Sequence, residues 1–388
     1  MPLGISFYTF QSVGYLVDVY WGKEKADKNI FKVALFVSFF PQIIQGPISR
    51  HSELAKQFDE PHKFNYEQIL SGFLLILWGL FKKLLIADVF ATMVNIGFDK
   101  VSGLNGLQSV IVVLAYLIQD YADFSGCIDI AMGTAECFGI KLPQNFNRPY
   151  FSFTIPEYWR RWHMTLGTWF KDYIFYPISI SKFSLKLGKF GKKCFGEKFG
   201  KQLPAIFGLA IVWLSTGIWH GASWNYILWG AYYGLIIIFG IVFKPVYTKI
   251  IEKLKINTKS WWYRTFQWIR TIWLLCVGRI IFRANSIADA WILFKNTFKF
   301  FKFDYTFASV SNLLITNSNI LIVALVAFLI LFAVDLFIEL KPNINIRGEL
   351  NNKKILQTFV VVGLAIVILL FGSYGPGFSA QDFVYMQF

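Results

Sequence analysis

The stretch QLPAIFGLAIVWLSTGIWHGASWNYILWGAYYGLIIIFGIVF, residues 202–243, contains no Asp, Glu, Lys or Arg. The hydrocarbon core of a bilayer takes about 20 apolar residues per helical crossing, so this run is long enough for two crossings. The whole chain has the same character, because 55% of its 388 residues are hydrophobic, 19% are aromatic and only 16% are charged. Soluble domains carry about a quarter charged residues. The composition therefore predicts an all-α, multi-pass transmembrane protein.

Further apolar stretches are distributed along the chain. Together with residues 202–243 they predict about eight to ten membrane-embedded segments, some of them re-entrant or lying in the interface. Because no internal repeat of fixed period is visible, we expect residues 1–388 to form one membrane domain, with 182–202 as a Lys/Gly-rich linker. The stretches lie at residues 33–49, 69–81 with a continuation to 98, 101–119, 305–334 and 355–381, with an arginine-punctuated candidate at 265–282.

The net charge of +15 is concentrated in two places. Seven lysines fall between Lys182 and Lys201, and a second basic cluster runs from Lys244 to Arg270. If residues 202–243 make two crossings, both clusters lie on one side, as expected of cytoplasmic loops next to apolar spans. We therefore interpret this charge as a topology signal and expect no nucleic acid partner. An anionic partner, such as lipid headgroups or a phosphate-bearing acyl donor, is the alternative.

The four cysteines are scattered without metal-ligand spacing or a Cys-x-x-Cys pair. The apolar runs also contain no nucleophile elbow, phosphate-cradling glycine loop or His-Glu-x-x-His motif. We therefore predict neither a disulfide, a metal site nor a bound cofactor. The cysteines are Cys127, Cys137, Cys194 and Cys276.

Carboxylates interrupt the apolar segment YADFSGCIDIAMGTAECFGIKLPQNFNRPYF at 121–151. Asp129 and Glu136 are seven residues apart and therefore share one helical face. Carboxylates inside membrane segments are costly and usually face the protein interior, where they are candidates for function. We favour a structural role, in which they either pair with arginines and hold helices together or lie at the level of the lipid headgroups. The arginines considered for this role are Arg148, Arg160 and Arg161.

The segment EYWRRWHMTLGTWFKDYIFYP, residues 157–177, has the pattern of one amphipathic helix. At about 100° per residue, one arc is aromatic and contains His163, whereas the opposite arc is polar. A site role for His163 and a simple hydrogen bond to a neighbouring carbonyl are both open. The aromatic arc holds Trp159, Trp162, His163, Leu166, Trp169, Phe170 and Tyr173, and the polar arc holds Arg161, Thr165, Thr168 and Asp172.

The one histidine of the apolar run, His220, lies in STGIWHGASW at 215–224. Desolvation disfavours the imidazolium, so a histidine at membrane depth is expected to be neutral near pH 7 and able to accept a proton. Gly217 and Gly221 allow close helix approach, and we expect Trp219 and Trp224 to line the space around the imidazole. The pattern favours function over a packing histidine, which stays the alternative. The polar residues expected to satisfy freed backbone groups are Ser215, Thr216, Ser223 and Asn225.

A family resemblance rests on seven blocks that occur in this order: GISFYTFQSVGYLVDVYWG, SFFPQIIQGPISR, LWGLFKKLLIADVFA, YADFSGCIDIAMG, LPQNFNRPY, WRRWHMTLGTWFKDYIFYP and WHGASWNYILWG. Together they closely resemble the membrane-bound O-acyltransferase family, and within it the bacterial alginate O-acetyltransferase branch. The resemblance implies that the histidine of the Trp-His-Gly block, His220, is catalytic, and that the histidine of the Arg-Trp-His block, His163, is a second family-marking residue.

The resemblance also implies a reaction. An acyl-thioester donor, expected to be acetyl-CoA, supplies the acyl group, and a hydroxyl of an exported or cell-surface polysaccharide accepts it. His220 would act as the general base, with His163 in support and an extracytoplasmic acetyltransferase partner completing the transfer. The location implied is the bacterial cytoplasmic membrane. The predicted substrate-binding residues are Arg160, Arg161, Asp172, Trp219 and Asn225.

Two departures from the family pattern limit these expectations. Relatives usually carry several further helices before the GISFYTFQ block, so we expect this chain to lack them. After FYPI the alginate enzymes continue with a glycine pair and a basic loop, whereas ISISKFSLKLGKFGKK follows here, which argues against naming alginate as the acceptor.

Three other functions stay open. The first is D-alanylation of teichoic acid by the same family, although the ASWNYILWG and NFNRPY spellings favour the acetyltransferases. The second is a transporter in which Asp129, Glu136 and His220 form a proton or ion path. The third is a non-catalytic scaffold for a polysaccharide complex.

Overall fold

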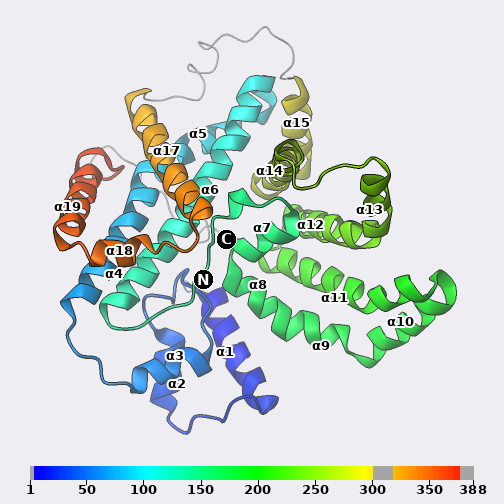
Figure 1. Ribbon diagram of the computed structural model, residues 1–388, viewed down its shortest axis with the longest axis horizontal. Helices are drawn as coiled ribbons and strands as arrows, with labels where there is room; N and C mark the ends of the chain where they lie inside the picture. Colours follow the sequence, from blue (N-terminus) through cyan, green and yellow to red (C-terminus); the bar gives the residue numbers. More distant parts are fainter. Residues whose placement is uncertain (1–3, 300–317, 376–388) are drawn as a thin grey trace. The chain divides into compact units, whose positions relative to one another are not determined.

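A computed structural model describes residues 4–299 and 318–375 of the chain (Figure 1). Helices are the regular elements throughout these residues, with no strand among them. Seven helices in the described residues are long and apolar enough to cross a membrane, which confirms the all-α, multi-pass prediction. They are Tyr66–Asp99, Gly106–Cys137, Glu197–Trp219, Trp224–Val242, Trp261–Arg283, Ser318–Leu340 and Lys354–Phe371.

One expected segment, residues 33–49, is not among the seven. Its apolar residues form only the nine-residue helix α2 (Ile30–Ser38), and turns follow up to the start of α3 (His51–Asp59). Pro41 and Pro47 explain the ending, because proline lacks the N–H that would continue a helix. Parts of the expected segments 305–334 and 355–381 lie outside the described residues.

The contacts divide the chain into two compact units. Unit 1 comprises Met1–Asn145 and Lys295–Phe388, and unit 2 comprises Phe146–Phe294. The helix α15 (Ile287–Phe298) contributes to both. That the chain acts as one domain stays a prediction.

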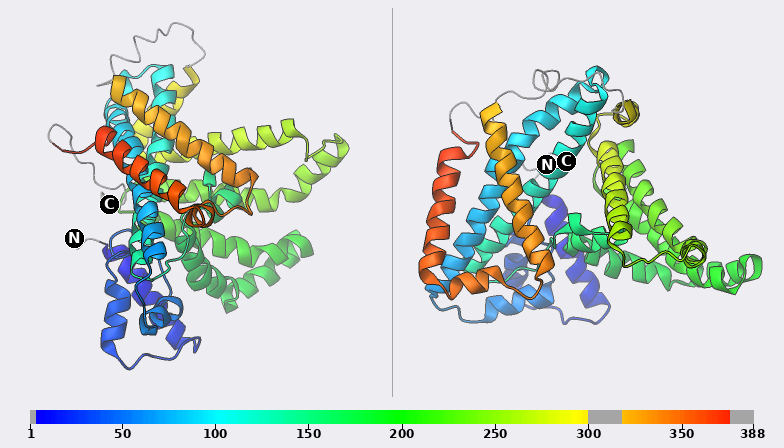
Figure 2. Two further views of the ribbon diagram at one scale, coloured as in Figure 1. Left: turned by 60° about the vertical axis from the view of Figure 1, so that its left-hand side comes forward. Right: turned by 45° about the horizontal axis from the view of Figure 1, so that its top comes forward.

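The core of unit 1 is a long helical run packed along α6 (Gly106–Cys137). The run consists of α4 (Tyr66–Phe81), a π-helical segment (Lys82–Ala87) and α5 (Asp88–Asp99). Its contact with α6 is close because glycines face each other: a Cβ on Gly79 would lie 2.5 Å from the carbonyl oxygen of Gly126. α4 and α6 lie side by side in every view (Figures 1 and 2).

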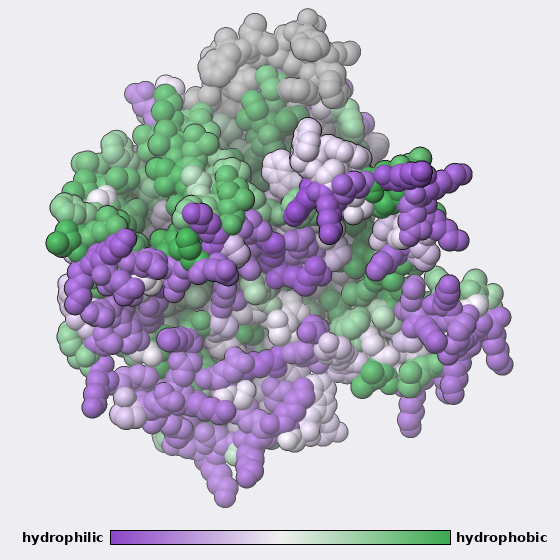
Figure 3. Space-filling model, viewed as in Figure 1, coloured by the Kyte–Doolittle hydropathy of each residue, from purple (hydrophilic) through white to green (hydrophobic). Residues whose placement is uncertain are grey.

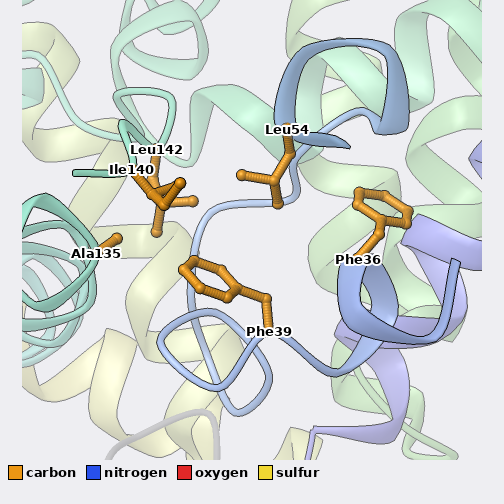
Figure 4. Close-up of a cluster of buried hydrophobic side chains, with 6 residues drawn as sticks. All are labelled: Phe36, Phe39, Leu54, Ala135, Ile140 and Leu142. Atoms are coloured by element: carbon orange, nitrogen blue, oxygen red, sulfur yellow. The ribbon is translucent and has the colours of Figure 1, made fainter. Parts of the chain in front are cut away.

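The remaining elements of unit 1 surround this pair. The helices α1 (Ile5–Tyr20), α2 and α3 come first, and a buried apolar cluster joins α2 and α3 to the end of α6 and the segment after it (Figure 4). The cluster contains Phe36, Phe39, Leu54, Ala135, Ile140 and Leu142. The last described helices are α17 (Ser318–Leu340), α18 (Ile346–Asn351) and α19 (Lys354–Phe371).

Paired charges lie inside unit 1. The Nζ atom of Lys83 is 2.8 Å from a carboxylate oxygen of both Asp88 and Asp123, and Lys82 pairs with Asp129 and hydrogen-bonds Ser125. On a regular helix two adjacent side chains point about 100° apart, whereas the π-helical segment lets both lysines reach α6.

The carboxylates of α6 therefore have other partners than the arginines expected from the sequence. Asp129 pairs with Lys82, and Glu136 with Arg347 of α18 at 2.7 Å. The structural role predicted for them agrees with this pairing, but Arg148, Arg160 and Arg161 do not provide it. A sequence pattern names candidate cations without their distances, which explains the error.

Unit 2 is built around α11 (Glu197–Trp219), α12 (Trp224–Val242) and α14 (Trp261–Arg283). α11 and α12 form a tight hairpin, since a Cβ on Gly217 would lie 2.5 Å from the carbonyl oxygen of Tyr226. The segment 182–202 is not a linker: it forms α10 and the first turns of α11. The other helices are α7 (Ile155–Arg161), α8 (Met164–Phe170), α9 (Tyr176–Ser179), α10 (Lys182–Phe195) and α13 (Lys244–Lys253).

Candidate functional site

The backbone at His163 corrects the expectation of a single helix over residues 157–177. α7 ends at Arg161, Trp162 is extended with φ −108° and ψ 129°, and His163 is left-handed with φ 45° and ψ 53° before α8 begins. Left-handed backbone is unfavourable for a residue with a Cβ and concentrates at functional sites. The break also buries Thr165, which the single helix placed on its polar arc.

Local hydrogen bonds fix the position of α7. Thr154 caps it by accepting from the backbone N–H of Glu157, whose carboxylate accepts from the N–H of Phe153. From α14, Thr271 and Arg270 donate to the carbonyl oxygen of Phe153 at 2.8 and 3.0 Å. The entry into the break at His163 is therefore held by a second helix of the same unit.

His220 lies in the short turn between α11 and α12. Its backbone N–H donates to the carbonyl oxygens of Thr216 and Gly217, so it completes the last turn of α11. Gly221 follows with φ 142°, a value that requires glycine. The amide of Asn225 donates to the carbonyl oxygen of Ala284 at 2.6 Å, which ties the start of α12 to the segment after α14.

Aromatic rings surround the imidazole of His220. The centroids of Trp229 and Phe282 lie 4.9 and 5.0 Å from it, both edge-on. Trp219 lies 4.6 Å from His220 and 6.4 Å from His163, so one indole contacts both imidazoles. Each histidine is only 4% exposed. The structure thus brings together the two histidines that the sequence singled out.

Burial controls the protonation of both histidines, which lie in connections outside the candidate spans. It lowers the pKa of His163 to about 3. It also lowers the pKa of His220 well below the ordinary value, and His163 and the guanidinium of Arg279 lower it further. Both imidazoles are therefore neutral at physiological pH and able to accept a proton.

Arg279 is a buried residue of the site that sequence reasoning missed. It lies on α14, is 3% exposed, donates to the hydroxyl of Tyr158 at 3.0 Å and stands 4.6 Å over the ring of Trp162. Its position in an apolar segment is the sequence feature from which it could have been predicted, because an arginine at membrane depth is costly and is a candidate for function. The arrangement places a fixed positive charge near the neutral imidazole of His220.

The other predicted binding residues are placed differently. Trp219 and Asn225 flank His220, but Asn225 is buried and its amide donates to the backbone. Arg160 is exposed, and Arg161 pairs with Glu157 at 2.8 Å. Asp172 is half-buried in the π-helical segment Lys171–Phe175. Their roles in substrate binding stay predictions. No group of three His, Cys, Asp or Glu that could hold a metal ion occurs in residues 4–299 and 318–375.

Comparison with known proteins identifies the family. The model of the membrane-bound O-acyltransferase family matches residues 24–287. The chain belongs to the membrane-bound O-acyltransferases. It is 34% identical over 300 residues to the probable alginate O-acetylase AlgI of Pseudomonas aeruginosa, covering 77% of this chain and 52% of that protein. It is also 34% identical to the peptidoglycan O-acetyltransferase of Helicobacter pylori, covering 75% and 55%.

A more distant relative of this chain is the teichoic acid D-alanyltransferase of Bacillus subtilis, which is 28% identical over 72% of this chain and 68% of its own length. The chain spans about half the length of the first two relatives, 52% and 55%. The family match includes both histidines, so His163 and His220 lie in the part of the chain that defines the family.

Proposed function

We propose that this membrane-bound O-acyltransferase moves acetyl groups from a thioester donor to hydroxyls of an exported or cell-surface polysaccharide, in the bacterial cytoplasmic membrane. The observation that carries the proposal is the pair of buried imidazoles that contact Trp219. The relatives support the reaction class, because the more similar of them are named as O-acetylating enzymes.

In this reaction His220 is the general base. Its neutral imidazole takes the proton of the acceptor hydroxyl as the oxygen forms a bond to the thioester carbonyl carbon. The tetrahedral intermediate collapses, the C–S bond breaks, and the imidazolium returns its proton to the thiolate. Positioned base catalysis of this kind contributes about 10²–10⁴-fold to the rate. A low pKa suits the return of the proton, because a buried imidazolium is a strong acid.

Arg279 and His163 have supporting roles in the proposal. The guanidinium supplies positive charge where the carbonyl oxygen becomes an oxyanion, and a water-poor surrounding strengthens that interaction. His163, on the other side of Trp219, orients the donor. The left-handed backbone that places it is conformational strain of the kind that enzymes keep at their sites.

The donor, acceptor and partner are the finer parts of this proposal. Acetyl-CoA is the proposed donor and acts as a co-substrate rather than a resident cofactor. An extracytoplasmic acetyltransferase is the proposed partner that completes delivery to the polysaccharide. The predicted binding residues Trp219, Arg160, Arg161 and Asp172 are proposed to contact these substrates.

The transporter interpretation has weaker support. It expected Asp129, Glu136 and His220 to form one path, but Asp129 pairs with Lys82 and Glu136 with Arg347, both within unit 1. Carboxylates that neutralise cations have a structural explanation and do not call for an ion path.

The test replaces the chromosomal gene in the native host by His220→Ala and measures acyl esters on the cell-surface polysaccharide. We expect loss of acetate released by mild alkali, with the protein present in the membrane at its normal level. His62→Ala is the matched control, since His62 is exposed and its ring contacts the backbone oxygen of Gln57. A normal level of ester in the His220 variant would overturn the proposal. Release of D-alanine in place of acetate would show that the transferred acyl group is D-alanyl and would contradict acetyl transfer.

A further inference from the structure

Helix α10 carries a narrow stripe of lysines. At about 100° per residue, the four lysines lie within an arc of about 60° along the helix. All four side chains are exposed. We call this set the lysine stripe; it consists of Lys182, Lys186, Lys189 and Lys193.

The opposite face of α10 packs against α11 through small residues. Ser184, Gly188 and Gly191 are buried there. A Cβ on Gly188 would lie 3.0 Å from the Pro204 side chain and 3.3 Å from the carbonyl oxygen of Gly200. Because this close contact fixes the rotation of α10, the lysine stripe points away from α11.

Within residues 4–299 and 318–375 the stripe lysines have no carboxylate partner, whereas the neighbouring lysines Lys192 and Lys201 do. Glu197 pairs with Lys192 at 3.0 Å and with Lys201 at 3.2 Å. None of the four stripe lysines takes part in an ion pair with another described residue. Four like charges are thus held side by side on a rigid helix, which favours an external anionic partner.

Aromatic side chains border the stripe. Phe183 and Phe190 lie on one flank of α10 and are 62% and 58% exposed. Figure 3 shows hydrophilic residues beside hydrophobic ones over α10. α10 thus has a face of small residues against the protein, a flank of phenylalanines and a stripe of lysines. This pattern is typical of a helix at the membrane interface, whose aromatic rings lie among the acyl chains and whose ammonium groups lie at the headgroups.

We propose that the lysine stripe binds the anionic headgroups of lipids in the cytoplasmic leaflet. α11 and α12 form a hairpin, so α10 and the basic helix α13 lie at the same end of unit 2, which the positive-inside rule assigns to the cytoplasm. This leaflet carries negative charge, and each nearby lysine contributes about fivefold to binding, from about 1 kcal/mol.

The distance to His220 favours lipid over the phosphates of the acyl donor. Gly200, which packs beside the second half of α10, lies about 30 Å from His220 at a rise of 1.5 Å per residue, whereas Phe207, which contacts Phe183 at the start of α10, lies about 20 Å from it. A pantetheine arm is shorter than 30 Å, so the far end of the stripe does not hold the donor's phosphates while the thioester lies at His220.

The test is a titration of the purified full chain with phosphatidylglycerol or phosphatidylcholine of identical acyl chains, read by native mass spectrometry. The variant replaces all four stripe lysines by Gln. We expect the unaltered protein to prefer phosphatidylglycerol, and the variant to lose at least about tenfold of that affinity even with salt screening. The matched control neutralises four exposed lysines of the α13 region, Lys244, Lys249, Lys253 and Lys259, and is expected to lose clearly less of the preference than the stripe variant.

A second variant, with the four stripe lysines replaced by Arg, keeps the charge and the topology signal and is expected to bind phosphatidylglycerol normally. Equal losses in the two Gln variants would show that only net charge matters and would overturn the proposal. Equal binding of both lipids by the unaltered chain would do the same. Release of phosphatidylglycerol by added coenzyme A would assign the stripe to the donor instead.

Discussion

The two units bury polar side chains in opposite ways. In unit 1 the side chains of Lys83, Asp88 and Asp123 are 7%, 7% and 2% exposed, and the lysine forms an ion pair with each carboxylate at 2.8 Å. In unit 2 His163 and His220 are equally buried but lie against aromatic rings, with Arg279 as the nearby charge.

This difference separates structural from chemical roles for buried ionisable groups. A buried carboxylate beside an ammonium group is stabilised by that ion pair. Removing either side chain leaves the other charge buried without compensation. A neutral imidazole among indole and phenyl rings has a nitrogen that can accept a proton. We therefore assign stability to the charges of unit 1 and chemistry to the histidines of unit 2.

The largest expected effect comes from breaking a pair in unit 1. Lys83→Met leaves Asp88 and Asp123 without their cation, so the free energy of unfolding should fall by about 3–5 kcal/mol. Denaturation by SDS in mixed micelles measures this. Lys354→Met at the exposed pair with Glu67 is the control, and a similar loss there would remove the distinction between buried and exposed pairs.

The next effect concerns the charge in unit 2. Arg279→Gln removes the fixed positive charge, so kcat should fall by about 10²–10³-fold, the range for losing an oxyanion donor. The same change raises the pKa of His220, because Arg279 lowers it, and the acid limb of the kcat profile should move to higher pH. An unchanged limb would show that Arg279 only supports packing.

The third prediction concerns pH and stability. His163 has its pKa lowered to about 3 in the folded protein, so below the unfolded pKa of about 6.5 the unfolded chain binds more protons and stability falls. Between about pH 7 and about pH 5 the loss from His163 is about 2 kcal/mol, and His220 adds to it in the same direction. His163→Gln should flatten the profile of unfolding free energy, and a profile equal to that of the unaltered chain would contradict the burial argument.

The last prediction concerns the α11–α12 hairpin that holds His220. A Cβ on Gly230 would clash with the carbonyl oxygen of Trp213, so Gly230→Ala should cost about 1–3 kcal/mol. Gly240, on the same helix, has nothing within 4 Å of such a Cβ, so Gly240→Ala should stabilise α12 slightly through helix propensity. Thermal unfolding in detergent compares the two, and equal midpoints would show that the helices separate without cost.

The apolar runs predicted most of the fold, because span length and hydrophobicity depend on local composition. The failures have local causes. Residues 33–49 are apolar enough to cross, but Pro41 and Pro47 interrupt the helix. Residues 182–202 have the composition of a linker, yet glycines of α10 pack on α11.

The site was predictable in its histidines and less so in its geometry. His220 stood out because an ionisable residue is rare in an apolar segment, and His163 because it lies on the aromatic arc and in the Arg-Trp-His block. The left-handed backbone of His163 left no trace in the periodicity of residues 157–177, since one residue with positive φ breaks a helix without changing its composition. Arg279 shares residues 265–282 with one other arginine, Arg270, and only packing shows which of the two is fully buried.

The most direct test of the central claim compares His220→Ala with Lys83→Met in the same membranes, measuring both the amount of folded protein and the acetyl ester formed per folded molecule. The account predicts a normal amount of protein without ester for His220→Ala, and a reduced amount with normal ester per molecule for Lys83→Met. The reverse pattern, or ester formation by His220→Ala, would contradict the division of roles between the two units.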